Sequence, residues 1–236
     1  ALAQERSFEE VAALLWTGDF AVPTTLGRNV SGQESWEFTG DLANPMERYQ
    51  AALAAVAPTD LAAYQTGADT VTRTGLRILH LLTFATTGQA PEHSLARALQ
   101  QRWAPGDAVA EKLLSAALIL CADHELNVSA FTARCVASAG SSPYAVVIAA
   151  LSALQGRKHG GHTTLVAALL DDAAHGLRPA IAAQLQRTGS VPGFGHPLYP
   201  NGDPRAQLLL AMLNERYPNA SIVSLANKLC AAIDTE

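Results

Sequence analysis

Three histidines interrupt otherwise apolar stretches of this sequence and are its first candidates for chemistry: His124, His159 and His196. They lie too far apart along the chain to form a local metal-binding motif such as HExxH. Loops between packed helices can nevertheless bring such residues together. Because an imidazole donates, accepts or exchanges a proton near neutral pH, each is a candidate for hydrogen-bonding or acid–base work.

Two of these histidines also have plainer structural explanations. His124 stands at the C-terminus of a predicted helix, where the helix dipole favours a histidine as a cap, but the acidic residues on both sides of it make the position more polar than a cap requires. His159 precedes Gly160 and Gly161, which let the backbone come close to a ligand, and the next helix would offer its N-terminal N–H groups to an anion or a developing oxyanion. On spacing alone, a flexible turn is the better explanation of this glycine stretch.

A metal site at His159 and His162 is the weaker alternative for the same stretch. The two imidazoles are spaced i, i+3, but no carboxylate or thiol follows nearby to complete a ligand set. We therefore expect no metal.

His196 lies in a second glycine-rich loop, Gly193–Tyr199, which is followed by Asp203 and Arg205. The arginine could hold a carboxylate through two parallel hydrogen bonds. The aspartate has a simpler role as the N-cap of a helix that begins near Pro204. Since the sequence has no GxSxG, P-loop or dinucleotide-binding fingerprint, the common hydrolase, NTPase and dehydrogenase classes are disfavoured.

The elements that must position these loops are predicted to be helices. Strand patterns are nearly absent, and apolar residues recur at helical spacing between short loops. Ser7 and Glu10 form a capping-box pattern, and Gly18 ends that first helix. Thr59–Asp60 is expected to cap a helix that runs through Thr66. We expect full burial of the helix over 144–154, because it is apolar on all sides. The helices are expected over 8–16, 45–56, 60–66, 72–86, 94–103, 107–122, 127–139, 144–154, 163–174, 180–187, 205–215 and 221–233, with irregular structure over 22–45.

Composition narrows the class of protein. Hydrophobic residues make up 49% of the 236 residues, charged residues only 16%, and the formal net charge is -5. The hydrophobic content is enough for a sizeable core. The low charged content suggests that a partner chain covers part of the surface. Nucleic-acid binding is not favoured, because the sequence has no run of basic residues. No apolar stretch is long enough to span a membrane, and no signal peptide opens the chain. The three cysteines, without any CxxC pair, fit small core residues in a reducing, cytoplasmic setting.

Four stretches, taken in order, resemble the citrate synthase family. They are Ser7–Gly18, Ala122–Arg134, Lys158–Gly161, and Gly193–His196 with Asp203–Arg205. The resemblance implies an all-α homodimer with a large helical domain at 1–158, whose start would be missing, and a small domain at 159–236, whose end would be missing. It implies condensation of acetyl-CoA or propionyl-CoA with oxaloacetate, giving citrate or 2-methylcitrate and CoA, with no permanently bound cofactor.

The same resemblance implies roles for individual residues. His159 would donate to the acyl-CoA thioester oxygen as an enol forms, and His196 would polarise the ketone of oxaloacetate. His124, Arg205 and Asn127 would bind the oxaloacetate, and closure of the domains would exclude water. The residues expected near CoA are Lys158, Gly160 and Gly161.

Several departures from the family pattern leave alternatives open. The family's catalytic aspartate, in an Asn-x-Asp-Phe stretch, would lie beyond Glu236, so we expect the chain alone to lack the general base. Pro197 and Pro200 replace basic residues, and His162–Thr163 replaces Ala-Asn, near the expected CoA end of the site. A citryl-CoA lyase-like enzyme and a non-catalytic carboxylate-binding or regulatory homologue are therefore the alternatives to a synthase.

Overall fold

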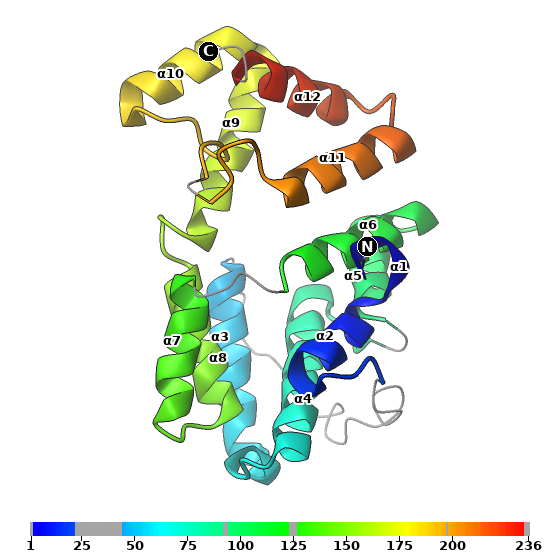
Figure 1. The fold of residues 1–236 in the computed structure, drawn as a ribbon, viewed down its shortest axis with the longest axis vertical. Helices are drawn as coiled ribbons and strands as arrows, with labels where there is room; N and C mark the ends of the chain where they lie inside the picture. Colours follow the sequence, from blue (N-terminus) through cyan, green and yellow to red (C-terminus); the bar gives the residue numbers. More distant parts are fainter. Residues whose placement is uncertain (1, 22–43, 92–93, 123–126, 197, 234–236) are drawn as a thin grey trace. The chain divides into compact units, whose positions relative to one another are not determined.

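The computed structural model describes residues 2–21, 44–91, 94–122, 127–196 and 198–233 (Figure 1). Every regular element in these ranges is a helix, so the expected all-α class is confirmed. None of the helices in the described part of the chain is long and apolar enough to cross a bilayer.

The chain divides into two compact units, 1–155 and 156–236, which are described separately. The large and small domains expected at 1–158 and 159–236 stay a prediction. In the first unit the helices are α1 Leu2–Glu5, α2 Phe8–Thr17, α3 Pro45–Val56, η3 Ala57–Thr59, η4 Leu61–Tyr64, α4 Ala68–Thr87, α5 Leu95–Trp103, α6 Ala108–Leu120, α7 Val128–Ser138 and α8 Pro143–Leu154. In the second unit they are η5 Gly160–His162, α9 Thr163–His175, α10 Leu177–Thr188, α11 Pro204–Arg216 and α12 Ser221–Ile233.

Local sequence signals set several helix ends as expected. The Ser7 hydroxyl accepts from the Glu10 amide at 3.2 Å, and the Glu10 carboxylate accepts from the Ser7 amide at 2.8 Å, which completes the capping box of α2. Gly18 ends this helix in the left-handed conformation, with φ +80°. Pro143 begins α8 behind a Ser142 cap.

Two apolar clusters on either side of α4 form the core of the first unit. Ile78 and Leu81 pack with residues of α3 and α8, and Leu79 packs with residues of α2, α5 and α6. Because successive residues of a helix point in different directions, one helix can serve both clusters. The buried members are Ala52, Leu53, Val56, Ala63, Ile78, Leu81 and Tyr144 in the first cluster, and Phe8, Val11, Leu95 and Ile119 in the second.

The expected capping role of Asp60 is wrong. Residues 61–64 form a 3₁₀ helix without a side-chain cap, and Asp60 is instead buried. Its carboxylate accepts a hydrogen bond from the Tyr144 hydroxyl at 2.9 Å and lies 3.3 Å from a guanidinium nitrogen of Arg77. Burial, and then the hydrogen bond to Asp60, raise the pKa of Tyr144. The carboxylate therefore links the start of η4 to α4 and α8. A buried charge without partners is costly, which explains why Asp60 pairs with Tyr144 and Arg77.

Burial of the apolar helices is less complete than the sequence pattern predicts. α8 packs against α3 and α7 (Figure 1), yet Tyr144 is its only buried residue, so the expected full burial of 144–154 is wrong for this chain by itself. α7 buries no residue, and both Cys121 and Cys135 are exposed rather than in the core. An apolar pattern shows which sides of a helix avoid water but not which of them this chain covers.

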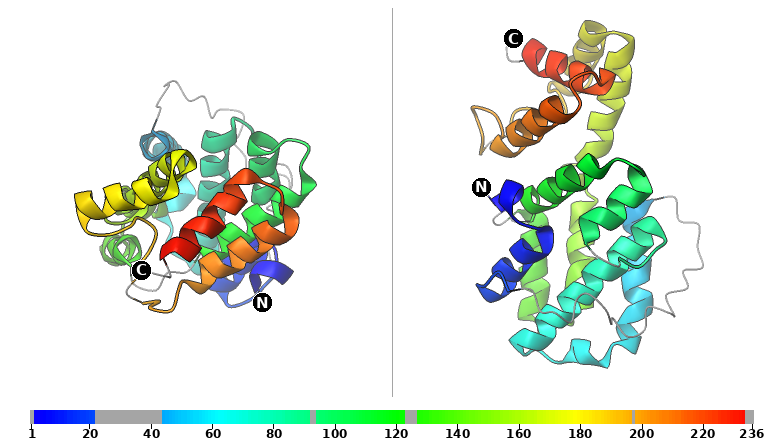
Figure 2. Two further views of the ribbon diagram at one scale, coloured as in Figure 1. Left: turned by 90° about the horizontal axis from the view of Figure 1, so that it is seen from above. Right: turned by 90° about the vertical axis from the view of Figure 1, so that its right-hand side faces the viewer.

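The second unit has its own core between α9, α10 and α12. Its buried residues are Leu169, Ala173, Ala180, Ile181, Val191 and Leu229, with Phe194 packed partly against them. Val191 and Phe194 therefore anchor the loop that continues to His196. α11 and α12, in orange and red, lie side by side (Figure 2), and reciprocal hydrogen bonds between Asn214 and Asn227 link them.

Candidate functional site

His159 lies in the tight turn that follows α8 along the chain and leads into α9. This turn belongs to the second unit. The His159 amide donates to the Gly156 carbonyl at 2.9 Å, and the His159 carbonyl accepts from the His162 amide at 3.0 Å. The Thr163 hydroxyl donates to the Gly160 carbonyl at 2.8 Å, at the start of α9. These bonds shape the turn, and its last three residues form η5.

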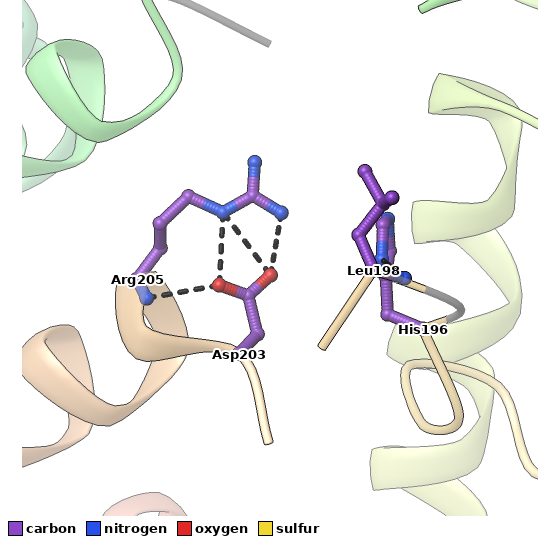
Figure 3. Close-up of polar contacts among 4 residues, drawn as sticks. All are labelled: His196, Leu198, Asp203 and Arg205. Atoms are coloured by element: carbon purple, nitrogen blue, oxygen red, sulfur yellow. Dashed lines mark hydrogen bonds and ion pairs between the residues drawn. The ribbon is translucent and has the colours of Figure 1, made fainter. Parts of the chain in front are cut away.

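The loop between α10 and α11 fixes the orientation of the His196 ring. The Leu198 amide donates to His196 Nδ1 at 3.2 Å (Figure 3). A ring nitrogen that accepts a hydrogen bond carries no proton, so the neutral ring holds its proton on Nε2. Since the residue is exposed, His196 presents an N–H donor from a ring whose tautomer is set by the backbone.

Arg205 is held by an acidic residue at the start of α11. Its Nε donates to the two Asp203 oxygens at 2.9 and 3.1 Å, and its Nη2 forms an ion pair with the same carboxylate (Figure 3). Asp203 also accepts from the Arg205 amide at 2.9 Å, so its expected role as N-cap is confirmed. The hydrogen bonds from the Arg205 side chain lower the pKa of Asp203 against the effect of burial.

Tyr199 contacts both the histidine of this loop and the arginine at the start of α11. Its ring centroid lies 5.1 Å from that of His196 and 5.1 Å from the Arg205 guanidinium carbon. A cation over an aromatic face is attracted by the ring quadrupole. The imidazole and the guanidinium therefore share Tyr199 as a neighbour, and these two groups are of the kinds that polarise a carbonyl and bind a carboxylate.

Other residues predicted for the site have different standings. His124 lies outside the described residues. The Asn127 side-chain oxygen accepts from the Ala130 amide and the Ser129 hydroxyl, both at 2.9 Å, so it is the N-cap of α7. Lys158 is exposed in the turn before His159. The roles assigned to Asn127, Lys158, Gly160 and Gly161 stay predictions.

Sequence reasoning missed two contributors to this site. Tyr199 was not singled out because an aromatic residue in a proline-rich loop has no local signature. The sequence suggested His162 as a weak candidate metal ligand and as part of a departure from the family pattern, not as a residue that contacts the loop before His196. Its ring instead meets the loop before His196, where Nε2 accepts from the Gly193 amide at 3.4 Å.

Comparison with known proteins supplies the family. The family profile described as "Citrate synthase, C-terminal domain" matches residues 1–235. The chain belongs to the citrate synthase family. The resemblance inferred from the four sequence stretches is thereby confirmed.

Individual members of the citrate synthase family align with parts of the chain. It is 44% identical over 98 residues to Citrate synthase 2 of Bacillus subtilis, covering 41% of this chain and 26% of that protein. It is 36% identical over 100 residues to 2-methylcitrate synthase of Shewanella oneidensis, covering 42% of this chain and 27% of that protein. The aligned part thus spans about a quarter of these curated relatives.

Solved structures confirm the citrate synthase fold over nearly the whole chain. The citrate synthase of Thermotoga maritima superposes with a TM-score of 0.73 at 23% identity, covering 99% of this chain and 69% of that one. The citrate synthase of Pyrobaculum aerophilum gives a TM-score of 0.63 at 24% identity, covering 91% of this chain and 62% of that one.

Proposed function

We propose that the protein containing this chain condenses acetyl-CoA or propionyl-CoA with oxaloacetate, giving citrate or 2-methylcitrate and CoA. The observation that carries the proposal is the fixed tautomer of His196, together with an Arg205 guanidinium that contacts the same Tyr199 ring. An N–H donor on this loop and a guanidinium in the first turn of α11 suit a 2-oxo acid, whose ketone and carboxylate are adjacent. The guanidinium has five N–H donors, so Asp203 and a substrate carboxylate can share it.

The proposed reaction divides the work between the two histidines. A general base takes a proton from the carbon next to the thioester, while His159 donates to the thioester oxygen and stabilises the enol. The enol carbon attacks the ketone carbon of oxaloacetate, and His196 donates to the oxygen that becomes the new hydroxyl. Water then cleaves the thioester, which releases CoA and the tricarboxylic acid.

The substrates would be held by further residues of the chain. Arg205, Asn127 and His124 are proposed for oxaloacetate, and Lys158 with Gly160 and Gly161 for CoA. A thioester and a ketone need no redox group or metal for this step, so we propose that acyl-CoA is a co-substrate and that no cofactor stays bound.

We also propose a homodimer in the cytoplasm. α7 leaves Val128 and Phe131 exposed by 64% and 58%, and the neighbouring α8 is apolar with one buried residue. Exposed apolar helix faces of this extent are typical of surfaces that meet another chain. A second copy is the proposed occupant, and Phe131→Glu should shift the mass measured by light scattering from dimer to monomer.

Paired variants test the catalytic assignment in the protein containing this chain. His159→Ala should lower kcat by about 10²–10³-fold with little change in oxaloacetate affinity, because its hydrogen bond strengthens only as the enol forms. Arg205→Leu should instead weaken oxaloacetate binding by about 10–100-fold, as expected for a lost charge-assisted hydrogen bond.

Matched controls and contrary outcomes are available for both variants. His175→Ala, at the far end of α9, and Arg216→Leu, at the far end of α11, should leave both constants unchanged. An unchanged kcat in His159→Ala would remove that histidine from the mechanism. Intact oxaloacetate binding in Arg205→Leu would show that Arg205 does not bind the substrate carboxylate.

A further inference from the structure

His162 makes a contact that joins two loops of the second unit. It ends the 3₁₀ turn that begins just after His159, and its Nε2 accepts a hydrogen bond from the Gly193 amide at 3.4 Å. The two residues are 31 positions apart, so this bond ties the turn before α9 to the loop after α10. An Nε2 that accepts requires a neutral ring with its proton on Nδ1.

A second contact brings the same loop onto α9. Gly193 has φ +88°, and a Cβ built there would lie 3.3 Å from a methyl carbon of Val166. Val166 stands four residues after His162, so both contacts lie on one side of the first turns of α9. Only glycine accommodates the positive φ and the close approach together.

Each end of the bridge stands three residues along the chain from a proposed catalytic histidine. His159 precedes His162 in one turn, where the His162 amide donates to the His159 carbonyl at 3.0 Å. Gly193 precedes His196 by three residues in the glycine-rich loop. Any shift of the loop along α9 would therefore change the separation of the two imidazoles.

We propose that His162 is a positioning residue, which holds the loop carrying His196 against the turn carrying His159. This inference rests on the proposed function for the catalytic roles of those two histidines. The donor–acceptor distance is long for a hydrogen bond, so the direct contribution to stability is small. Its effect is expected on the geometry of catalysis, where small displacements of a reacting group are costly.

The experiment compares His162→Ala, which removes the acceptor, with His162→Gln, whose amide oxygen can accept from the same N–H. His175→Ala is the matched control, because His175 is exposed at the other end of α9, with its Nδ1 beside the Asp171 carbonyl. Three quantities are measured on the protein containing this chain: the exchange rate of the Gly193 amide proton, the NMR shifts of the His159 and His196 rings, and the steady-state constants.

The expected result is selective. His162→Ala should accelerate exchange at Gly193, move both ring signals and lower kcat by about tenfold with a smaller change in KM. His162→Gln should restore most of each property, and His175→Ala should change none. A merely structural role would not give this split between kcat and KM or its rescue by glutamine.

The contrary results are distinguishable from failure of the proposed function. Unchanged exchange at Gly193 in His162→Ala would overturn the bridge whether or not the protein is active. Faster exchange with unmoved ring signals would overturn the positioning role. If the wild-type protein releases no CoA, the proposed function fails, and the exchange and ring shifts still decide the bridge.

Discussion

Replacing Tyr144 with phenylalanine isolates the most deeply buried polar contact of the first unit. The Tyr144 side chain is fully buried at 0% exposure, and Asp60 is 4% exposed. The change removes only the hydroxyl that donates to Asp60, and Arg77 stays as the remaining partner of the carboxylate. A hydrogen bond to a charged group contributes about 1.5–3 kcal/mol, so we expect a loss of about 2 kcal/mol.

Urea unfolding followed by tryptophan fluorescence measures this loss. All three tryptophans lie in residues 1–155, so the signal reports on the first unit. With an m-value of about 2 kcal/mol/M, the midpoint should fall by about 1 M, and protein concentration must be kept constant because a dimer would shift it. Asp60→Ala should cost more, about 3–5 kcal/mol, since it leaves the Arg77 charge without its carboxylate.

The control for this series is Tyr64→Phe, on the 3₁₀ helix next to Asp60, where the side chain is 69% exposed. The hydroxyl that this change removes is exposed to water and belongs to no buried pair, so the urea midpoint should not move. Equal midpoints for Tyr144→Phe and Tyr64→Phe, with unchanged slopes, would refute the argument that the buried carboxylate ties α4 to α8.

Three other perturbations have defined outcomes. Burial lowers the pKa of His80 below its usual 6.5, so the unfolded chain binds the proton first and the free energy of unfolding should fall as the pH drops through 6.5. Between pH 7.5 and 5.5 the urea midpoint should decrease more in wild type than in His80→Leu, and equal decreases would contradict this. Gly193→Ala should lower kcat more than Gly195→Ala, because both have positive φ but only the first Cβ would crowd α9; equal kcat values would show that the contact with α9 is unimportant. Asp203→Ala should speed amide exchange in the first turn of α11, whereas Asp203→Asn should not, because asparagine also caps a helix; identical exchange in the two variants would argue against the cap.

Local sequence signals predicted the helical class and many helix ends. Ser7, Glu10 and Asp203 satisfy backbone groups within three residues of themselves, so their roles can be read from a short stretch. The four family stretches likewise identified the family before any geometry was known. The caps depend on interactions that are close in sequence, and the family pattern depends on residue identity and order alone.

Long-range contacts could not be predicted in the same way. Asp60 meets Tyr144 across 84 residues, and His162 meets Gly193 across 31. From the sequence, Asp60 is expected to cap a helix and His162 is a possible metal ligand. Spacing along the chain does not show which distant group either side chain will contact. The apolar character of α8 was evident, but which of its sides this chain covers depends on tertiary packing.

Release of free CoA thiol shows whether the protein condenses an acyl-CoA with oxaloacetate. The protein containing this chain is mixed with acetyl-CoA or propionyl-CoA, with and without oxaloacetate, and thiol is followed with a chromogenic reagent. Thiol release should require oxaloacetate, and the faster acyl-CoA identifies the citrate or 2-methylcitrate reaction. No release with either acyl-CoA, from folded protein that still binds oxaloacetate, would contradict the account and favour a non-catalytic homologue.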